Sequence, residues 1–322
     1  MTTPRQVFDE YLAGRARRHV VAPFAEHLAA RIAGTNYQAM TADAASWAAS
    51  LQKMASFLKL DGVIVGADTT LLAEAMGAPI IWRGDWPEIG GRPVSMAGDF
   101  NHHGRLGTAV ETANRLFQII RGTHGCIAAM VGPMTLANQI YGAENAREGL
   151  GTLKAALVSV AEAFSKTRPD ILLLLESANL TECANISHYR RIISAIKNVA
   201  SYYNIKLGIY AEDFAYAQLL EISHLNADLY IFGGTSCQSR PPINDLENVN
   251  AGLGIALHMD NFARIAPDAL DFMKDRNDNP ALFITSFGEI AADAEIENIR
   301  NFLTDIGNIS LEEKRQEESI GI

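Results

Sequence analysis

The sequence predicts an α/β protein and, within that class, a closed (β/α)8 TIM barrel. Short apolar runs rich in β-branched residues alternate with longer segments of helical periodicity along the chain, and eight such runs occur. Continuously apolar strands separated by helices are typical of a parallel sheet covered by those helices. Neither GxGxxG nor GxxxxGKS/T is present, which disfavours an open nucleotide-binding sheet.

The eight runs define the predicted strands. They are Val20–Pro23, Gly62–Val65, Ile127–Val131, Ile171–Leu175, Lys206–Tyr210, Leu229–Phe232, Leu253–Leu257 and Leu282–Thr285.

The segments between these runs are predicted to be helices. In the segment that starts at Thr41, this residue is expected to cap a helix. Two further helices are expected, from about Ala146 to Ser165 and from Ser187 to Tyr202. The first of the three helices carries one apolar stripe, formed by Ala44, Trp47, Leu51, Met54 and Leu58.

Residues 80–99 interrupt the alternation of strands and helices. Their Gly90-Gly91 pair predicts the turn of a hairpin inserted over the barrel mouth. Apart from this insertion the pattern is continuous, so residues 1–322 are expected to form a single barrel domain.

Composition narrows the classes of function. The chain has 322 residues, 48% of them hydrophobic, and a formal net charge of −10. Such an acidic surface repels nucleic acid and anionic lipid, so neither is an expected partner. The charged N-terminus does not resemble a signal peptide, and no apolar run is long enough to span a membrane. We therefore expect a cytoplasmic protein whose three cysteines, Cys126, Cys183 and Cys237, are reduced thiols.

In a barrel of this class the reactive side chains follow the strands, at their C-terminal ends. The residues in those positions form a ring that is rich in carboxylates. They are Asp68, Asn138, Gln139, Glu176, Ser177, Tyr210, Glu212, Asp213, residues 235–238 including Cys237, His258, Asp260, Ser286 and Glu289.

Glu176, Glu212 and Glu289 follow three different strands and are expected to face one cavity. Carboxylates that converge in a site with little water raise one another's pKa, which provides an acid and a base. Two alternatives remain open: the oxygen atoms bind a hard cation, or individual carboxylates pair with Arg240 or Arg264 or cap the next helix.

A sulfur-ligated zinc site is not expected. The sequence has no CxxC, HxC or HExxH motif, and the adjacent His102 and His103 do not have the spacing of chelating residues. Cys237 is the best-placed thiol and His258 the best-placed imidazole. Each is a candidate for substrate contact, and the alternatives are an inert thiol for Cys237 and a hydrogen-bonded core or rim residue for His258.

Four segments, in order, resemble the uroporphyrinogen decarboxylase superfamily, which includes cobalamin-dependent methyltransferases. They are LDGVIVGADTTLLAEAMG around Asp68, VGPMTLANQIYG with Asn138 and Tyr141, LLESA with Glu176 and Ser177, and FGEIAADAEIENI near the C-terminus. The chain is identified as a divergent member. The resemblance gives a catalytic role to Asp68 and Ser177. Asn138, Gln139, Tyr141 and Tyr210 are expected to bind substrate because they follow the strands at the barrel mouth.

The chain also departs from both branches of that family. The decarboxylase tyrosine and histidine fall on Gln139 and on Phe287 or Gly288. The zinc ligands of the methyltransferases fall on Tyr210, Glu212 and the Gly288-Glu289 pair. A substrate with eight carboxylates would need several cations, and the matched arginines are missing.

Three functions follow. The first is transfer of a methyl or other one-carbon group, with a corrinoid or tetrahydrofolate as carrier and catalysis by Asp68, Glu176, Ser177, Glu212 and Glu289. The second is a decarboxylase or carbon–carbon lyase acting on a small acid, and the third is a non-catalytic barrel subunit. The expected partners are a small-molecule substrate and a corrinoid protein, and the expected assembly is a homodimer.

Overall fold

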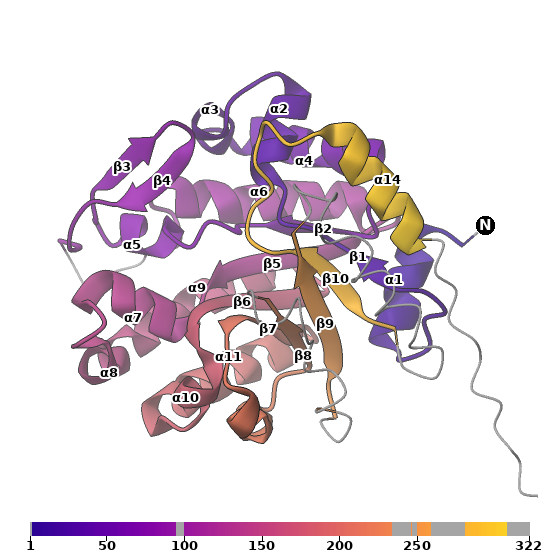
Figure 1. Ribbon diagram of the computed structural model, residues 1–322. Helices are drawn as coiled ribbons and strands as arrows, with labels where there is room; N and C mark the ends of the chain where they lie inside the picture. The colour runs from indigo at the N-terminus through magenta and orange to yellow at the C-terminus, as the bar shows by residue number, and fades with distance from the viewer. Residues whose placement is uncertain (1, 95–99, 234–245, 247–249, 259–280, 308–322) are drawn as a thin grey trace, which may run out of the picture.

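Eight parallel strands form the centre of the computed structural model, which describes residues 2–94, 100–233, 246, 250–258 and 281–307 (Figure 1). The strands are β1 (Val20–Val21), β2 (Gly62–Val65), β5 (Gly125–Val131), β6 (Ile171–Asn179), β7 (Lys206–Asp213), β8 (Leu229–Phe232), β9 (Gly252–Leu257) and β10 (Phe283–Ser286). Each of the eight predicted strands is confirmed.

The sheet order is β1-β10-β9-β8-β7-β6-β5-β2, and all of these pairs are parallel. The two edges, β1 and β2, meet through Asp61, which precedes β2. Its amide donates to the Val21 carbonyl and its carboxylate accepts from the Val21 amide, both at 3.0 Å. The sheet is thus nearly closed, and the predicted TIM barrel is confirmed.

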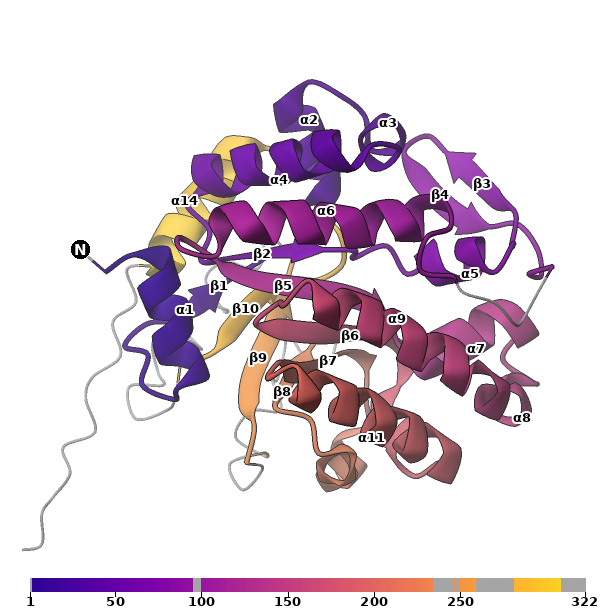
Figure 2. The ribbon, with the colours of Figure 1, turned by 180° about the vertical axis from the view of Figure 1, so that it is seen from behind.

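Helices surround the strands on the outside (Figures 1 and 2). They are α1 (Pro4–Leu12), α2 (Glu26–Ala33), α3 (Tyr37–Thr41), α4 (Ala44–Leu58), α5 (Leu71–Ala75), α6 (Gly104–Ile120), α7 (Pro133–Tyr141), α8 (Ala146–Gly149), η1 (Leu150–Leu153), α9 (Lys154–Lys166), α10 (Leu180–Ala184), α11 (Ser187–Tyr202), η2 (Tyr216–Leu225) and α14 (Ile296–Gly307). Among the described helices, none combines the length and the apolarity needed to cross a bilayer.

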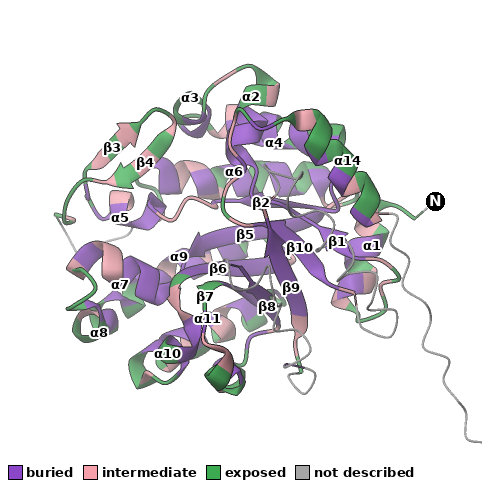
Figure 3. Cartoon of the chain, in the orientation of Figure 1, coloured by how far each residue is buried: buried purple, intermediate pink, exposed green. Residues whose placement is uncertain are grey.

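The strands are buried on both faces, which explains their continuous apolar sequences (Figure 3). In β6, Ile171, Leu173 and Leu175 belong to the cluster that fills the barrel, while Leu172 and Leu174 belong to the cluster beneath the helices. At the N-terminal end of the barrel, Phe8 of α1 packs so closely on Gly125 that a Cβ there would lie 2.3 Å from its ring. Because α1 closes this end, a functional site is expected at the C-terminal end of the barrel.

Two predicted helices differ in detail. The Oδ1 of Asp43, not Thr41, accepts from the Ser46 amide (2.7 Å) and caps α4, because Thr41 ends α3 with its hydroxyl bonded to the Tyr37 carbonyl (2.9 Å). The helix expected from Ala146 to Ser165 is broken by the 3-10 turn η1 into α8 and α9. The helix Ser187–Tyr202 is confirmed.

The inserted hairpin is present as β3 (Ile80–Arg83) and β4 (Trp86–Ile89), but its turn is not at Gly90-Gly91. The chain turns at Gly84, whose φ of +63° lies in the left-handed region that favours glycine. Gly90 instead ends the ribbon, with its amide donating to the Pro79 carbonyl at 2.7 Å. Residues 95–99 lie outside the described part of the chain.

Candidate active site

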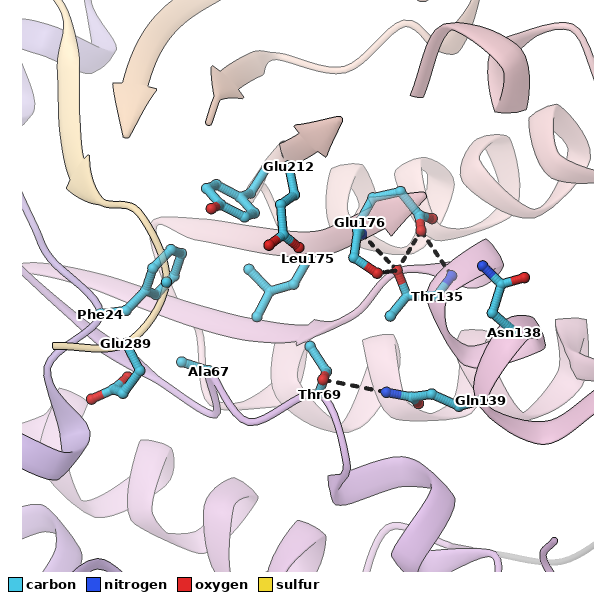
Figure 4. A pocket seen from close by; sticks show the side chains of 13 residues that line it. Phe24, Ala67, Thr69, Thr135, Asn138, Gln139, Leu175, Glu176, Glu212 and Glu289 are labelled. Carbon is cyan, nitrogen blue, oxygen red and sulfur yellow. Dashed lines mark hydrogen bonds between the residues drawn. The ribbon is translucent and has the colours of Figure 1, made fainter. Parts of the chain in front are cut away.

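A pocket of about 430 Å³ lies at the C-terminal ends of the strands (Figure 4). Its walls come from the C-terminal parts of β6 and β7, from the segments that follow β1, β2 and β10, and from helix α7. The lining residues are Phe24, Ala67, Thr69, Thr135, Asn138, Gln139, Leu175, Glu176, Ser177, Tyr210, Glu212, Gly288 and Glu289. Three carboxylates are among them, and the described part of the lining contains no lysine, arginine or histidine.

Glu176 is fully buried at the end of β6 and accepts hydrogen bonds from the first turn of α7. Its donors are the amides of Met134 (3.0 Å) and Thr135 (2.7 Å), the Thr135 hydroxyl, and the Tyr189 hydroxyl at 3.2 Å. Burial raises the pKa of Glu176, while the bonds from Thr135 and the backbone amides oppose that rise. With these donors, Glu176 fixes α7 against β6.

Ser177 lines the pocket as a hydrogen-bond donor. Thr135 directs its own hydroxyl proton to Glu176, so the Ser177 hydroxyl donates to Thr135 Oγ1 at 3.1 Å. The Ser177 amide donates to the same oxygen at 2.7 Å. This geometry orients Ser177 but does not pair its hydroxyl with a base that would activate it as a nucleophile.

Glu212 lies at the end of β7, where it is exposed at the mouth of the pocket. Partial burial and then the neighbouring charge of Asp213 raise the pKa of Glu212. Asp213 itself is exposed and accepts from the Asn179 amide group at 3.2 Å. Glu212 is thus a pocket carboxyl that can exchange protons with solvent.

Asn138 and Gln139 lie on α7 at the end of the pocket away from Phe24 and Glu289 (Figure 4). The Gln139 amide nitrogen donates to Thr69 Oγ1 at 3.3 Å. Its carbonyl oxygen is buried and has no hydrogen-bond partner within the described residues. That oxygen is an acceptor available to a ligand that donates a hydrogen bond.

Glu289 follows β10 and bonds to the N-terminal turn of α2. Its Oε1 accepts from the His27 amide at 2.8 Å and lies 3.5 Å from His27 Nδ1. A carboxylate at this position is favoured by the free amides and the dipole of a helix N-terminus. Glu289 therefore presents an anchored carboxylate to the pocket.

The expectation that Asp68 points into the cavity is not met. Asp68 forms a buried ion pair with Arg105 of α6, and its Oδ1 accepts from the Thr70 amide (2.8 Å) and hydroxyl (2.7 Å). Arg105 also bonds Glu74 at 2.6 Å. The sequence could not show this, because Arg105 is 37 residues away and enters from another helix. Thr69, the next residue, lines the pocket instead.

Other nominated residues also lie elsewhere. The Tyr141 hydroxyl bonds Thr152 Oγ1 at 2.6 Å, and its ring packs on Gly149, so Tyr141 joins α7 to η1 outside the pocket. His258 packs on Phe287 with 4.6 Å between ring centroids and is not a lining residue. Ser286 is buried and bonds the Phe24 backbone. Asp260 and residues 235–238, with Cys237, lie outside the described residues.

No residue after the first strand was among the predicted site residues, yet that segment supplies Phe24 to the pocket and Glu26 and His27 behind it. Glu26 is buried and accepts from the Gly66 amide (3.0 Å) and the Tyr37 hydroxyl (3.4 Å). Burial, and then the charge of Glu289, raises the pKa of Glu26 well above its usual value. The signal was available, because the polar residues Glu26 and His27 come soon after the run Val20–Pro23.

The described residues do not fit the zinc site of the methyltransferase branch. Cys126 and Cys183 are buried and are not among the residues that line the pocket, and burial raises the pKa of both thiols, that of Cys126 to about 12. No group of three histidine, cysteine or carboxylate side chains in the described part of the chain is arranged to hold a metal ion.

Comparison with known proteins agrees with the fold. The sequence profile of the uroporphyrinogen decarboxylase (URO-D) family matches residues 17–167. A methyltransferase from Methanosarcina mazei superposes with a TM-score of 0.74 at 14% identity, over 95% of this chain and 99% of that one.

A B12-independent methionine synthase from Shewanella sp. W3-18-1, solved in complex with selenomethionine, gives a TM-score of 0.53 at 14% identity, over 81% and 85% of the two chains. A search of curated protein sequences gives no match. The nearly closed parallel barrel thus carries the sequence profile of the uroporphyrinogen decarboxylase family over residues 17–167.

Proposed function

We propose that this protein is a methyl-type one-carbon transferase that acts on a small substrate bearing an amino group, with a corrinoid or folate-type carrier as the second substrate. The observation that carries the proposal is a pocket at the C-terminal end of the barrel that contains Glu176, Glu212 and Glu289 and no cationic side chain in its described lining. The superfamily and its structural neighbours, two of which are named methyltransferase and methionine synthase, support transfer chemistry.

The polar groups of the pocket favour a ligand that donates hydrogen bonds. Glu212 and Glu289 accept hydrogen bonds when ionised, and the buried carbonyl oxygen of Gln139 adds an acceptor. An ammonium group satisfies such acceptors. A polycarboxylate would meet like charge here, which argues against uroporphyrinogen and against the lyase on a small acid.

Glu212 is the residue suited to move a proton. When an amine nitrogen bonds to a methyl group, the bond from carrier to methyl breaks with its electrons left on the carrier, and the amine must release a proton. A carboxylate with a raised pKa, open to solvent, accepts that proton more readily than an ordinary surface glutamate. Glu289 would hold the ammonium form of the substrate, and Glu176 would keep α7 in place.

The test is a matched panel of small amines, alcohols, thiols and carboxylic acids, offered to the full chain. Binding is measured by calorimetry, and methyl transfer from methylcobalamin or methyltetrahydrofolate is followed by mass spectrometry of the product. We expect amines to bind best and the rate to rise as pH increases through the pKa of Glu212. That limb should vanish in Glu212→Gln and persist in Glu182→Gln, a change at an exposed glutamate of α10.

Two outcomes would overturn the proposal. One is preferential binding of carboxylic acids, with carbon dioxide or a cleavage product formed from them. The other is amine binding without methyl transfer from either carrier.

A further inference from the structure

The two ends of the pocket differ in their chemistry (Figure 4). The carboxylate of Glu289 lies at one end, and the amide side chains of Asn138 and Gln139 lie at the other. The apolar side chains of Ala67 and Leu175 lie between the two ends. A ligand that fills the pocket therefore needs an apolar middle and meets different groups at its two ends.

Three uncharged side chains, Thr69, Asn138 and Gln139, form what we call the amide end of the pocket. Gln139 Oε1 is buried and accepts no hydrogen bond from a described residue. The Gln139 amide nitrogen donates to Thr69 Oγ1 at 3.3 Å, so the Thr69 hydroxyl retains its own hydrogen for another acceptor. The Asn138 side chain adds a further N–H donor. The amide end thus offers both a buried acceptor and donors.

The amide end is held in place by the protein itself. The Glu176 carboxylate accepts from the amides of Met134 (3.0 Å) and Thr135 (2.7 Å) in the first turn of α7, and Asn138 and Gln139 follow one turn later. Because these side chains are positioned before a ligand binds, little ordering opposes their hydrogen bonds to it.

A carboxylate on the ligand would be poorly bound at the amide end. The described part of the pocket lining contains no lysine, arginine or histidine. Arg105 bonds the segment that follows β2, but its charge is paired with Asp68 and Glu74. A carboxylate there would lose water without gaining a counter-ion, and its oxygens would leave Gln139 Oε1 without a donor. The pocket therefore disfavours amino acids, which carry a carboxylate in addition to the amino group.

We infer that the substrate carries, at the end away from its amino group, an uncharged group that both donates and accepts hydrogen bonds, of which a primary amide is the simplest. Its N–H group donates to Gln139 Oε1, and its oxygen accepts from the Thr69 hydroxyl or the Asn138 amide. The inference rests on the proposed function for the amino group at Glu212 and Glu289. It narrows the substrate class to short amines with a polar, uncharged far end.

The test offers the full chain three amines of similar size that differ at the far end. They are γ-aminobutyramide, γ-aminobutyrate and isohexylamine, which end in an amide, a carboxylate and a branched hydrocarbon. Calorimetry measures the Kd of each, and mass spectrometry measures methyl transfer to each. We expect the amide to bind about tenfold more tightly than isohexylamine, because it satisfies the buried acceptor. The carboxylate should bind more weakly than either. Shorter and longer homologues of all three establish the chain length that fits the pocket.

Two variants test which end of the pocket binds which group. Gln139→Leu removes the buried acceptor and should reduce the preference for the amide over isohexylamine by about tenfold. Gln118→Leu is the matched control, because Gln118 lies exposed on α6 and its amide nitrogen donates to Asn114 at the same distance of 3.3 Å. Glu289→Gln should weaken the binding of the amide and of isohexylamine by the same factor, since both carry the amino group.

Three results would overturn the inference: equal affinities for the amide and isohexylamine, tightest binding of γ-aminobutyrate, or the same preference in Gln139→Leu as in the native chain. Methyl transfer to isohexylamine together with equal affinities would refute this inference and leave the proposed function intact. If none of the amines binds, both are wrong.

Discussion

Replacement of Arg105 by methionine tests the buried ion pair that holds Asp68 out of the pocket. Methionine keeps most of the aliphatic volume and removes the charge. Arg105 and Asp68 have side chains that are 9% and 7% exposed, and Arg105 also bonds Glu74 and, at 2.9 Å, the Thr70 hydroxyl. Removing one partner of a buried pair costs about 3–5 kcal/mol because the other charge stays buried.

For Arg105→Met, the structure indicates a loss of unfolding free energy at the lower end of that range. Asp68 keeps two bonds from Thr70, and Glu74 is 22% exposed and can hydrate. We therefore expect Arg105→Met to lower the free energy of unfolding by about 3 kcal/mol and Asp68→Asn by about 2. The double variant should lose about 3 rather than 5, a coupling of about 2 kcal/mol.

The assay is urea unfolding of the full chain followed by circular dichroism. Arg115→Met is the control, because Arg115 lies on the same helix in an exposed pair with Glu111, for which a loss below about 0.5 kcal/mol is expected. The reasoning is refuted if Arg105→Met costs no more than Arg115→Met, or if the two changes at Asp68 and Arg105 are additive.

Two further predictions concern the buried glutamates. Because the folded chain raises the pKa of Glu26 well above 4.5, it retains a proton that the unfolded chain releases, so stability falls as pH rises from about 4.5. Glu26→Gln should therefore raise the melting temperature at pH 8 and not at pH 4. If the variant and the native chain differ in melting temperature by the same amount at both pH values, the prediction is wrong. Glu176→Gln points an amide at donors that need an acceptor, and should cost about 2–3 kcal/mol in the urea assay. Glu182→Gln is the control at an exposed glutamate. An equal loss of unfolding free energy in both variants would show that the hydrogen bonds of Glu176 do not stabilise the fold.

The sequence alone predicted much of the pocket, because strand position determines it. Glu176, Glu212 and Glu289 each come shortly after an apolar run, and parallel strands in a barrel direct their C-terminal ends to one mouth. Asn138 and Gln139 reach the same pocket because the helix that follows β5 begins immediately after it.

Asp68 and Tyr141 show where this reasoning fails. Both have the right distance from a strand, but each meets a partner that position in the chain does not reveal: Arg105 for Asp68, and Thr152 and Gly149 for Tyr141. Which way a polar side chain turns at a strand end depends on the charges that other helices bring to it.

The sequence by itself determined the eight strands, because burial on both faces requires continuous apolar runs and local composition records that requirement. Only the tertiary structure decided the charges behind the pocket. His27 and Trp86 are 59 positions apart, and His27 and Glu289 are 262 apart. The stacking of His27 on Trp86 and the hydrogen bond from the His27 amide to Glu289 depend on how the hairpin folds over α2 and where the last strand ends. No local pattern encodes such contacts, because the free energy that holds them comes from burial and charge pairing between distant segments.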